Sequence, residues 1–148
     1  MKILKLLLAT ALMSLLALPP EALCQQPATV GEILDKGGQK LTKEEAIKLV
    51  TGATISGISM NYPDTKTEYT YKSDGSMSGG ASRISARGFT SVNGQWSVND
   101  DGQLCTDRTT SSRRSDVYCD HYFSLGGKYY ASRSTDKGAL VVEREIKR

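Results

Sequence analysis

Histidine, tryptophan and phenylalanine are scarce in this sequence, and their scarcity narrows the chemistry it can support. The 148 residues include one histidine, one tryptophan and two phenylalanines. The single histidine, His121, has no second imidazole with which to build a metal site, and no recognisable nucleophile or orienting partner accompanies it. We therefore expect no catalytic residues, no cofactor and no enzymatic activity.

The chain also lacks a strong excess of either charge. It has 19 lysines and arginines against 16 aspartates and glutamates, a net charge of +3. Nucleic-acid-binding domains show a strong basic excess or a clustered basic stripe. The balance of charges therefore predicts that nucleic acid is not a partner.

Only one long apolar run is present, and it lies near the N-terminus. Lys2 and Lys5 provide positive charge, Leu6–Leu18 is a 13-residue run without any charge, and Pro19-Pro20 ends it. Such a run is too short for a comfortable transmembrane helix and is typical of a secretory signal peptide. We expect residues 1–24 to be that signal, the protein to be periplasmic or secreted, and no transmembrane segment to remain after cleavage.

Cleavage after Cys24 would leave an even number of cysteines. Ala22 and Cys24 fit the small residues of an A-x-A-like cleavage site. The alternative is lipidation of Cys24, although Leu23 stands where a lipoprotein signal would have a small residue. Cys105 and Cys119 remain, and an oxidising compartment favours a disulfide between them. Closing a loop of 15 residues would stabilise the fold by roughly 3 kcal/mol.

The expected mature chain begins with a polar lead-in, residues 25–40, followed by a single β-rich domain, residues 41–148. A helix is predicted over Lys43–Thr51. Thr42 is a suitable N-cap, Glu45 completes a capping box three residues later, and Gly52 can end the helix.

After Gly52 the sequence becomes typical of antiparallel strands. Threonine, serine, tyrosine and valine dominate, and turn residues recur roughly every 8 to 12 positions. Alternation places Thr67, Tyr69 and Tyr71 on one face of a strand. We predict a mainly β fold, an antiparallel meander of about seven or eight strands with one N-terminal helix, curled or closed into a barrel. The helix would lie across the sheet or plug its end.

The expected core is lean, and one segment looks weakly structured. Residues 76–88 contain few apolar side chains, so we expect a mobile, weakly paired stretch. Besides tyrosines and the helix, the sequence offers these core residues: Phe89, Trp96, Val98, Leu104, Val117, Phe123, Leu125, Leu140, Val142 and Ile146.

The two cysteines are predicted to face each other across a hairpin. Antiparallel pairing about residues 111–112 would bring Cys105 opposite Cys119. A metal site made of these cysteines with Asp120 and His121 is disfavoured, because neighbours on a strand point to opposite faces and no C-x-x-C spacing exists. We therefore expect a structural disulfide and no metal.

Three arginines, Arg108, Arg113 and Arg114, fall on the predicted tip of this hairpin. They are candidates for contact with an anion or an acidic partner. The alternative, which the sequence favours, is a solvated loop in which Asp107 and Asp116 balance the charge.

The run GQWSVNDDGQLC, followed by a second cysteine and an aromatic strand, resembles a family of short exported proteobacterial proteins classed as a domain of unknown function, number 995. The resemblance implies a secreted bacterial domain and carries over no catalytic residue. Gly94 and Trp96 are also similar to the G-x-W motif of lipocalin-like calycins. That motif opens a calycin barrel, whereas here it lies in mid-chain, which argues against an eight-stranded ligand-binding barrel.

The segment SLGGKYYASRSTDKGALV is similar to the inhibitory loop region of membrane-bound and periplasmic lysozyme inhibitors, which are small disulfide-linked β-barrels. The resemblance implies that Ser124 and Lys137 would block a lysozyme cleft. Taken together, the sequence favours a non-enzymatic binding or interaction module whose ligand or protein partner it does not identify. The alternative is an inhibitor of a hydrolase such as lysozyme.

Overall fold

A computed structural model describes residues 28–110 and 115–148. Two helices and nine strands occur in these residues. In chain order they are α1 (Val30–Asp35), β1 (Gln39–Lys40), α2 (Lys43–Val50), β2 (Thr54–Ile58), β3 (Thr65–Tyr71), β4 (Ser76–Arg83), β5 (Phe89–Val98), β6 (Leu104–Thr110), β7 (Ser115–Leu125), β8 (Lys128–Ser132) and β9 (Val142–Lys147).

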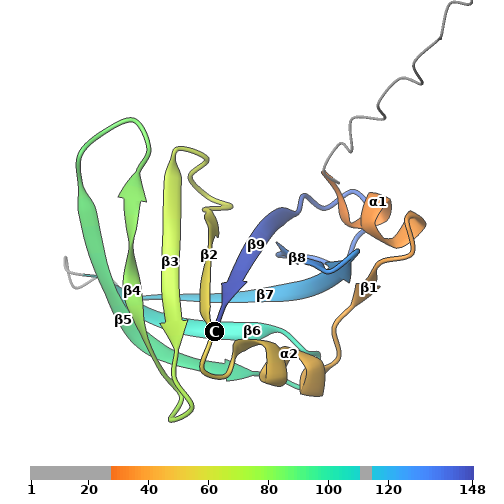
Figure 1. Cartoon of the computed structure of the whole chain (residues 1–148), viewed down its shortest axis with the longest axis horizontal. Coiled ribbons are helices and arrows are strands. Elements are labelled where there is room, and N and C mark those ends of the chain that lie inside the picture. Colours follow the sequence, from red (N-terminus) through yellow and green to blue (C-terminus); the bar gives the residue numbers. More distant parts are fainter. Residues whose placement is uncertain (1–27, 111–114) are drawn as a thin grey trace, which may run out of the picture.

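Strands β2 to β9 form a closed, eight-stranded antiparallel barrel (Figure 1). Each strand pairs with the next along the chain, and β9 closes the barrel by pairing with β2, where Ile146 lies opposite Ile55. The short strand β1 pairs with β7 outside this circuit. The predicted mainly β meander is therefore confirmed, and the sheet closes. The mid-chain position of the G-x-W motif did not exclude an eight-stranded barrel.

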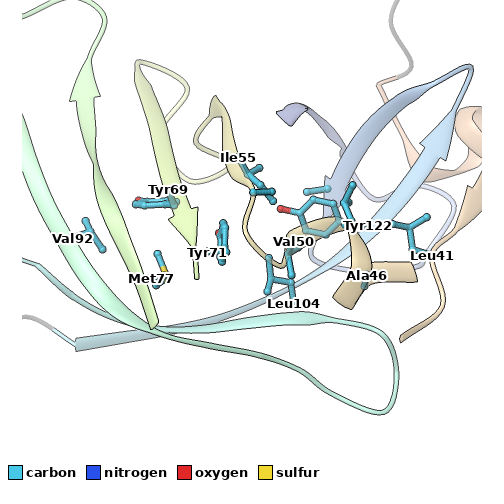
Figure 2. Packing of buried hydrophobic residues seen from close by; sticks show 13 residues of the cluster. Leu41, Ala46, Val50, Ile55, Tyr69, Tyr71, Met77, Val92, Leu104 and Tyr122 are labelled. Carbon is cyan, nitrogen blue, oxygen red and sulfur yellow. The ribbon is translucent and has the colours of Figure 1, made fainter. Parts of the chain in front are cut away.

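Helix α2 plugs one end of the barrel. Its N-terminus carries the predicted capping box, in which Thr42 Oγ1 accepts from Glu45 N and Glu45 Oε2 accepts from Thr42 N. At its other end Gly52 has a φ of +74°, a conformation that favours glycine. The predicted helix is thus confirmed to within one residue. Its buried face joins the barrel core (Figure 2), through Ala46, Leu49 and Val50.

Helix α1 covers the barrel from outside. Thr29 caps it, and Val30 and Ile33 are fully buried against Phe123 and Tyr130 of β7 and β8. This second cluster explains how Phe123, which faces away from the barrel interior, is still only 1% exposed. Within the described ranges, neither helix has the length and apolar character needed to cross a bilayer.

The residues that fill the barrel differ from part of the expected core. Phe89, Val117 and Leu140 are 69%, 68% and 74% exposed, so the sequence prediction was wrong for them. Tyrosine rings occupy the interior instead, and Tyr69 and Tyr71 are buried as their shared face predicted (Figure 2).

Strand β7 shows why the prediction failed. Alternation divides a strand into two faces without saying which face is buried. The structure turns Tyr118, Asp120 and Tyr122 into the barrel and leaves Val117 and Cys119 on the outer face. The more polar face of β7 is therefore the inner one.

The segment expected to be weakly paired contains a regular strand. β4 pairs with β3 on one side and with β5 on the other, so the prediction was wrong for Ser76–Arg83. Its glycines fit the neighbouring strands closely. A Cβ at Gly80 would lie 2.2 Å from the Phe89 ring, and a Cβ at Gly79 would lie 2.1 Å from the carbonyl oxygen of Glu68. β4 has few apolar side chains because glycines stand where the neighbouring strands and the Phe89 ring come close to its backbone.

Candidate functional site

The barrel encloses a cavity of about 220 Å³. It begins above the α2 plug and reaches the loop that joins β2 to β3, where Met60 and Tyr62 line it. Figure 1 places this loop at the opposite end of the barrel from α2. The cavity is therefore a pocket closed at one end by a helix and bordered at the other by loops.

The deepest part of the cavity is formed by apolar and tyrosine side chains. Ile55, Leu104 and Tyr122 line it next to α2 (Figure 2). Burial raises the pKa of Tyr122 to about 12, chiefly because a phenolate would be poorly solvated there. Burial also raises the pKa of Tyr71. Both phenols are therefore neutral at physiological pH.

Arg108 projects into the middle of the cavity from β6. Its Nη1 donates a hydrogen bond to Tyr69 Oη over 3.3 Å, and its guanidinium carbon lies 4.2 Å from the centre of the Tyr118 ring and 5.3 Å from that of Tyr69. Stacking on tyrosine faces is favourable for a guanidinium. Its Nε atom is buried and has no hydrogen-bond partner among the described residues.

A second guanidinium lies on the same tyrosine. The guanidinium carbon of Arg133 is 4.5 Å from the centre of the Tyr118 ring, and its Nη1 is 2.8 Å from Asp120 Oδ1. This contact is an ion pair whose geometry is not that of a hydrogen bond. Burial raises the pKa of Asp120 by more than Arg133, Arg144 and Arg108 together lower it. Asp120 is thus a buried carboxylate among these arginines, and its burial disfavours the ionised form.

Arg144 of β9 completes the group, and a glycine makes room for it. Its Nη1 donates to the carbonyl oxygen of Ile58 over 2.7 Å. A Cβ placed on Gly57 would come within 2.5 Å of that Nη1 and 2.8 Å of the carbonyl oxygen of Glu143. Any larger residue at position 57 would displace Arg144 from the cavity wall.

The charged residues of the cavity wall carry a net positive charge of one. They are Arg108, Arg133 and Arg144 with Asp116 and Asp120. Arg133 is exposed, whereas Arg108 and Arg144 are partly buried. The buried part of this charge is costly unless it is paired and hydrogen-bonded. The wall therefore favours a negatively charged occupant.

The structure separates the site residues that the sequence suggested. Arg108 lies in β6 with its side chain inside the barrel, so the interpretation as part of a solvated loop was wrong for this residue. Arg113 and Arg114 lie outside the described residues. Ser124 is in β7, opposite Gln39 of β1, and Lys137 is in the connection from β8 to β9.

Ser124 and Lys137 flank different ends of the α1 segment. The carbonyl oxygen of Lys137 accepts from Gly31 N, whereas that of Ser124 lies beside Gly38. Inhibition of a hydrolase through these two residues stays a prediction.

The sequence missed Asp120, Arg133 and Arg144 as neighbours of Arg108. A signal was present in β6, where Leu104, Thr106 and Arg108 alternate with outward-facing residues and line the cavity. An arginine in phase with a buried leucine indicates a charged side chain directed inward. The convergence of the other residues depends on barrel closure, which no local pattern reveals.

The predicted disulfide forms on the outer face of the barrel. Cys105 and Cys119 are directly opposite each other in the β6–β7 register and are bonded. Asp120 and His121 face opposite sides of β7 as expected, Asp120 toward the cavity and His121 away from it. Burial lowers the pKa of His121, and Lys40 adds to this effect. Within the described residues, no three side chains of histidine, cysteine, aspartate or glutamate meet as a metal site would require.

Comparison of this chain with models of known families, with curated proteins and with solved structures found no match. A functional proposal for this chain therefore rests on the side chains that line the cavity.

Proposed function

We propose that this protein is a non-enzymatic binding protein that holds a small organic anion inside its barrel. The observation that carries the proposal is Arg108, whose guanidinium lies in the cavity against the Tyr118 ring and whose buried Nε has no hydrogen-bond partner among the residues that the structure describes. A carboxylate or sulfonate oxygen could accept from this group, and a guanidinium suits such charged acceptors. An anionic ligand would also balance the net positive charge of the wall.

The size and lining of the cavity restrict the ligand further. A volume of about 220 Å³ is below the ~300–1,000 Å³ typical of sites for drug-sized molecules. Below Arg108 the wall turns apolar at Ile55 and Leu104. These features favour a compact anion with one apolar part, such as an aromatic or short-chain carboxylate.

The proposed place of action is outside the cytoplasm, in the periplasm of a bacterium or beyond. The disulfide between Cys105 and Cys119 supports an oxidising compartment, because such bonds are rare in reducing ones. The signal-like sequence of residues 1–24 supports the same location.

The test is calorimetric titration with benzoate, hexanoate and benzenesulfonate, each compared with its neutral amide. We expect at least one anion to bind and its amide to bind at least about tenfold more weakly, as the loss of a charge-assisted hydrogen bond implies. Arg108→Met should abolish this preference, while Arg108→Lys should retain part of it. Arg87→Met, a change at an exposed arginine, is the matched control.

Melting curves of both Arg108 variants verify that they remain folded. Equal binding of anions and amides would contradict the anionic ligand. Absence of binding by every probe to folded wild-type protein would contradict the proposed function for this class of compact anions.

A further inference from the structure

Exposed apolar side chains gather at the loop end of the barrel. Among the described residues, eight large hydrophobic side chains are exposed, and four belong to two neighbouring hairpins. We call these four the mouth rim: Ile58 (38% exposed), Tyr62 (64%), Ile84 (63%) and Phe89 (69%). Figure 1 shows both hairpin loops, β2–β3 and β4–β5, projecting on the side away from α2.

The structure holds the two loops of the mouth rim together. Asp64 Oδ1 accepts from Ser85 N over 3.1 Å, Asp64 Oδ2 accepts from Ser85 Oγ over 2.5 Å, and the Asp64 carbonyl oxygen accepts from Ile84 N over 2.8 Å. These bonds tie the β2–β3 loop to the β4–β5 loop. The apolar side chains are therefore presented as one unit.

Strand register places Ile58 and Phe89, two members of the mouth rim, in one row across the sheet. Ile58 lies opposite Lys66, Lys66 lies opposite Ser82, and Ser82 lies opposite Phe89. The Phe89 ring rests over Gly80, where a Cβ would come within 2.2 Å of it. Phe89 is thus supported from below and open to solvent above.

Positive charges accompany the apolar side chains. Lys66, Arg83 and Arg87 are exposed in the same two hairpins. The same hairpins carry two carboxylates, Asp64, which accepts the hydrogen bonds from Ser85, and the exposed Glu68 of β3, so the three cations leave a net positive charge of one. Apolar side chains flanked by lysine and arginine are the combination that binds the interface of an anionic bilayer.

We propose that the mouth rim docks on the surface of an anionic lipid bilayer. A second copy of the chain fits less well, because a stable protein interface needs about 800 Å² and 20–30 residues from each partner. The rim and its cations amount to seven side chains on two hairpins. Such a surface suits insertion at the boundary between lipid headgroups and acyl chains. Each aromatic or aliphatic side chain enters an apolar medium there and needs no complementary protein surface.

Docking would bring the cavity to the membrane. Tyr62 belongs both to the rim and to the cavity lining, so the loop end of the cavity would lie at the headgroup level. The surface does not require the proposed anionic ligand, and vesicle binding can be measured without one.

The test is co-sedimentation of protein beginning at Gln25, which retains every described residue, with vesicles of phosphatidylcholine alone or mixed with phosphatidylglycerol. We expect binding to the mixed vesicles, weaker binding to the neutral ones, and release by salt. The double variant I84D/F89D should bind at least about tenfold more weakly. The matched control is Ile47→Asp, which alters a side chain that is 40% exposed on α2 at the other end of the barrel, and it should bind as wild type does.

Two outcomes would overturn the proposal. In one, the wild-type protein stays in the supernatant with phosphatidylglycerol vesicles, or I84D/F89D, folded by its melting curve, sediments as wild type does. In the other, the wild-type protein dimerises in solution and I84D/F89D is monomeric, which would assign the rim to a second copy of the chain.

Discussion

The two ends of the barrel interior are built from different kinds of residue. Next to α2, Val50 and Leu104 pack with other buried apolar groups. Toward the loops, Arg108 and Arg133 stand against tyrosine faces around open space. The same alternation of inward and outward residues produces both. The apolar end beside α2 therefore supplies stability, and the end toward the loops can carry charged side chains.

The largest expected effect comes from removing apolar contact at the closed end. Leu49→Ala deletes a side chain of α2 that is only 6% exposed, and we expect it to lower the free energy of unfolding by about 2–5 kcal/mol. Thr90→Ala alters the loop end of the cavity lining, where the residue is exposed, and should change stability by less than about 0.5 kcal/mol. Urea unfolding measures both. Equal losses of unfolding free energy in the two variants would contradict the difference between the two ends.

The disulfide should matter for stability more than for binding. Replacing Cys105 and Cys119 with alanine is expected to cost about 2–4 kcal/mol and to lower the melting temperature by roughly ten degrees. The bond lies on the outer face of the barrel, and neither cysteine lines the cavity. Thermal melting and calorimetric titration check this prediction together. A double variant that melts normally but loses ligand affinity would place the cysteines in the working site.

The smallest effect concerns the buried carboxylate of Asp120, which lies opposite Leu104 in the cavity wall. Because burial raises the pKa of Asp120 in the folded state, the folded protein holds this proton more tightly than the unfolded chain does. The stability gained from that proton is fully present below the unfolded pKa and is lost as pH rises through the folded one. Protonation also removes a negative charge that competes with a ligand for Arg133.

Affinity for benzenesulfonate, which stays ionised in acid, should therefore rise roughly fivefold to tenfold as pH falls through the raised pKa of Asp120. Asp120→Asn should bind the sulfonate more tightly at neutral pH and show little of this pH dependence. Calorimetric titrations of both proteins over the acid range are the measurement. An unchanged pH profile in the variant would assign the titration to another group.

Local patterns predicted the elements of the fold well. Thr42 and Glu45 marked the start of α2, and the alternation about Tyr69 gave the two faces of β3. The opposition of Cys105 and Cys119 also followed from the hairpin. Each of these features depends on residues close together in the chain, or on one turn between them.

The candidate site was less predictable because it depends on how the sheet curves. Arg108, Arg133 and Arg144 come from three strands, and only closure of the barrel directs them into one space. The sequence likewise could not show that Phe123 would be buried from outside, since α1 supplies that cover from far along the chain. The sequence prediction also assumed that the apolar face of β7 is the inner one, whereas Tyr118 and Asp120 line the cavity.

The pairing of β2 with β9 has a consequence for how the chain acquires its shape. Ile55 meets Ile146, so the contact that closes the circuit joins the first barrel strand to the last. Closure must therefore await synthesis of residues 142–147, and at about 5–20 residues per second a growing chain spends several seconds with both sheet edges unpaired. Pairings so distant in sequence also form slowly. Until β9 has been made, the edge of β2 therefore stays available for pairing with another strand.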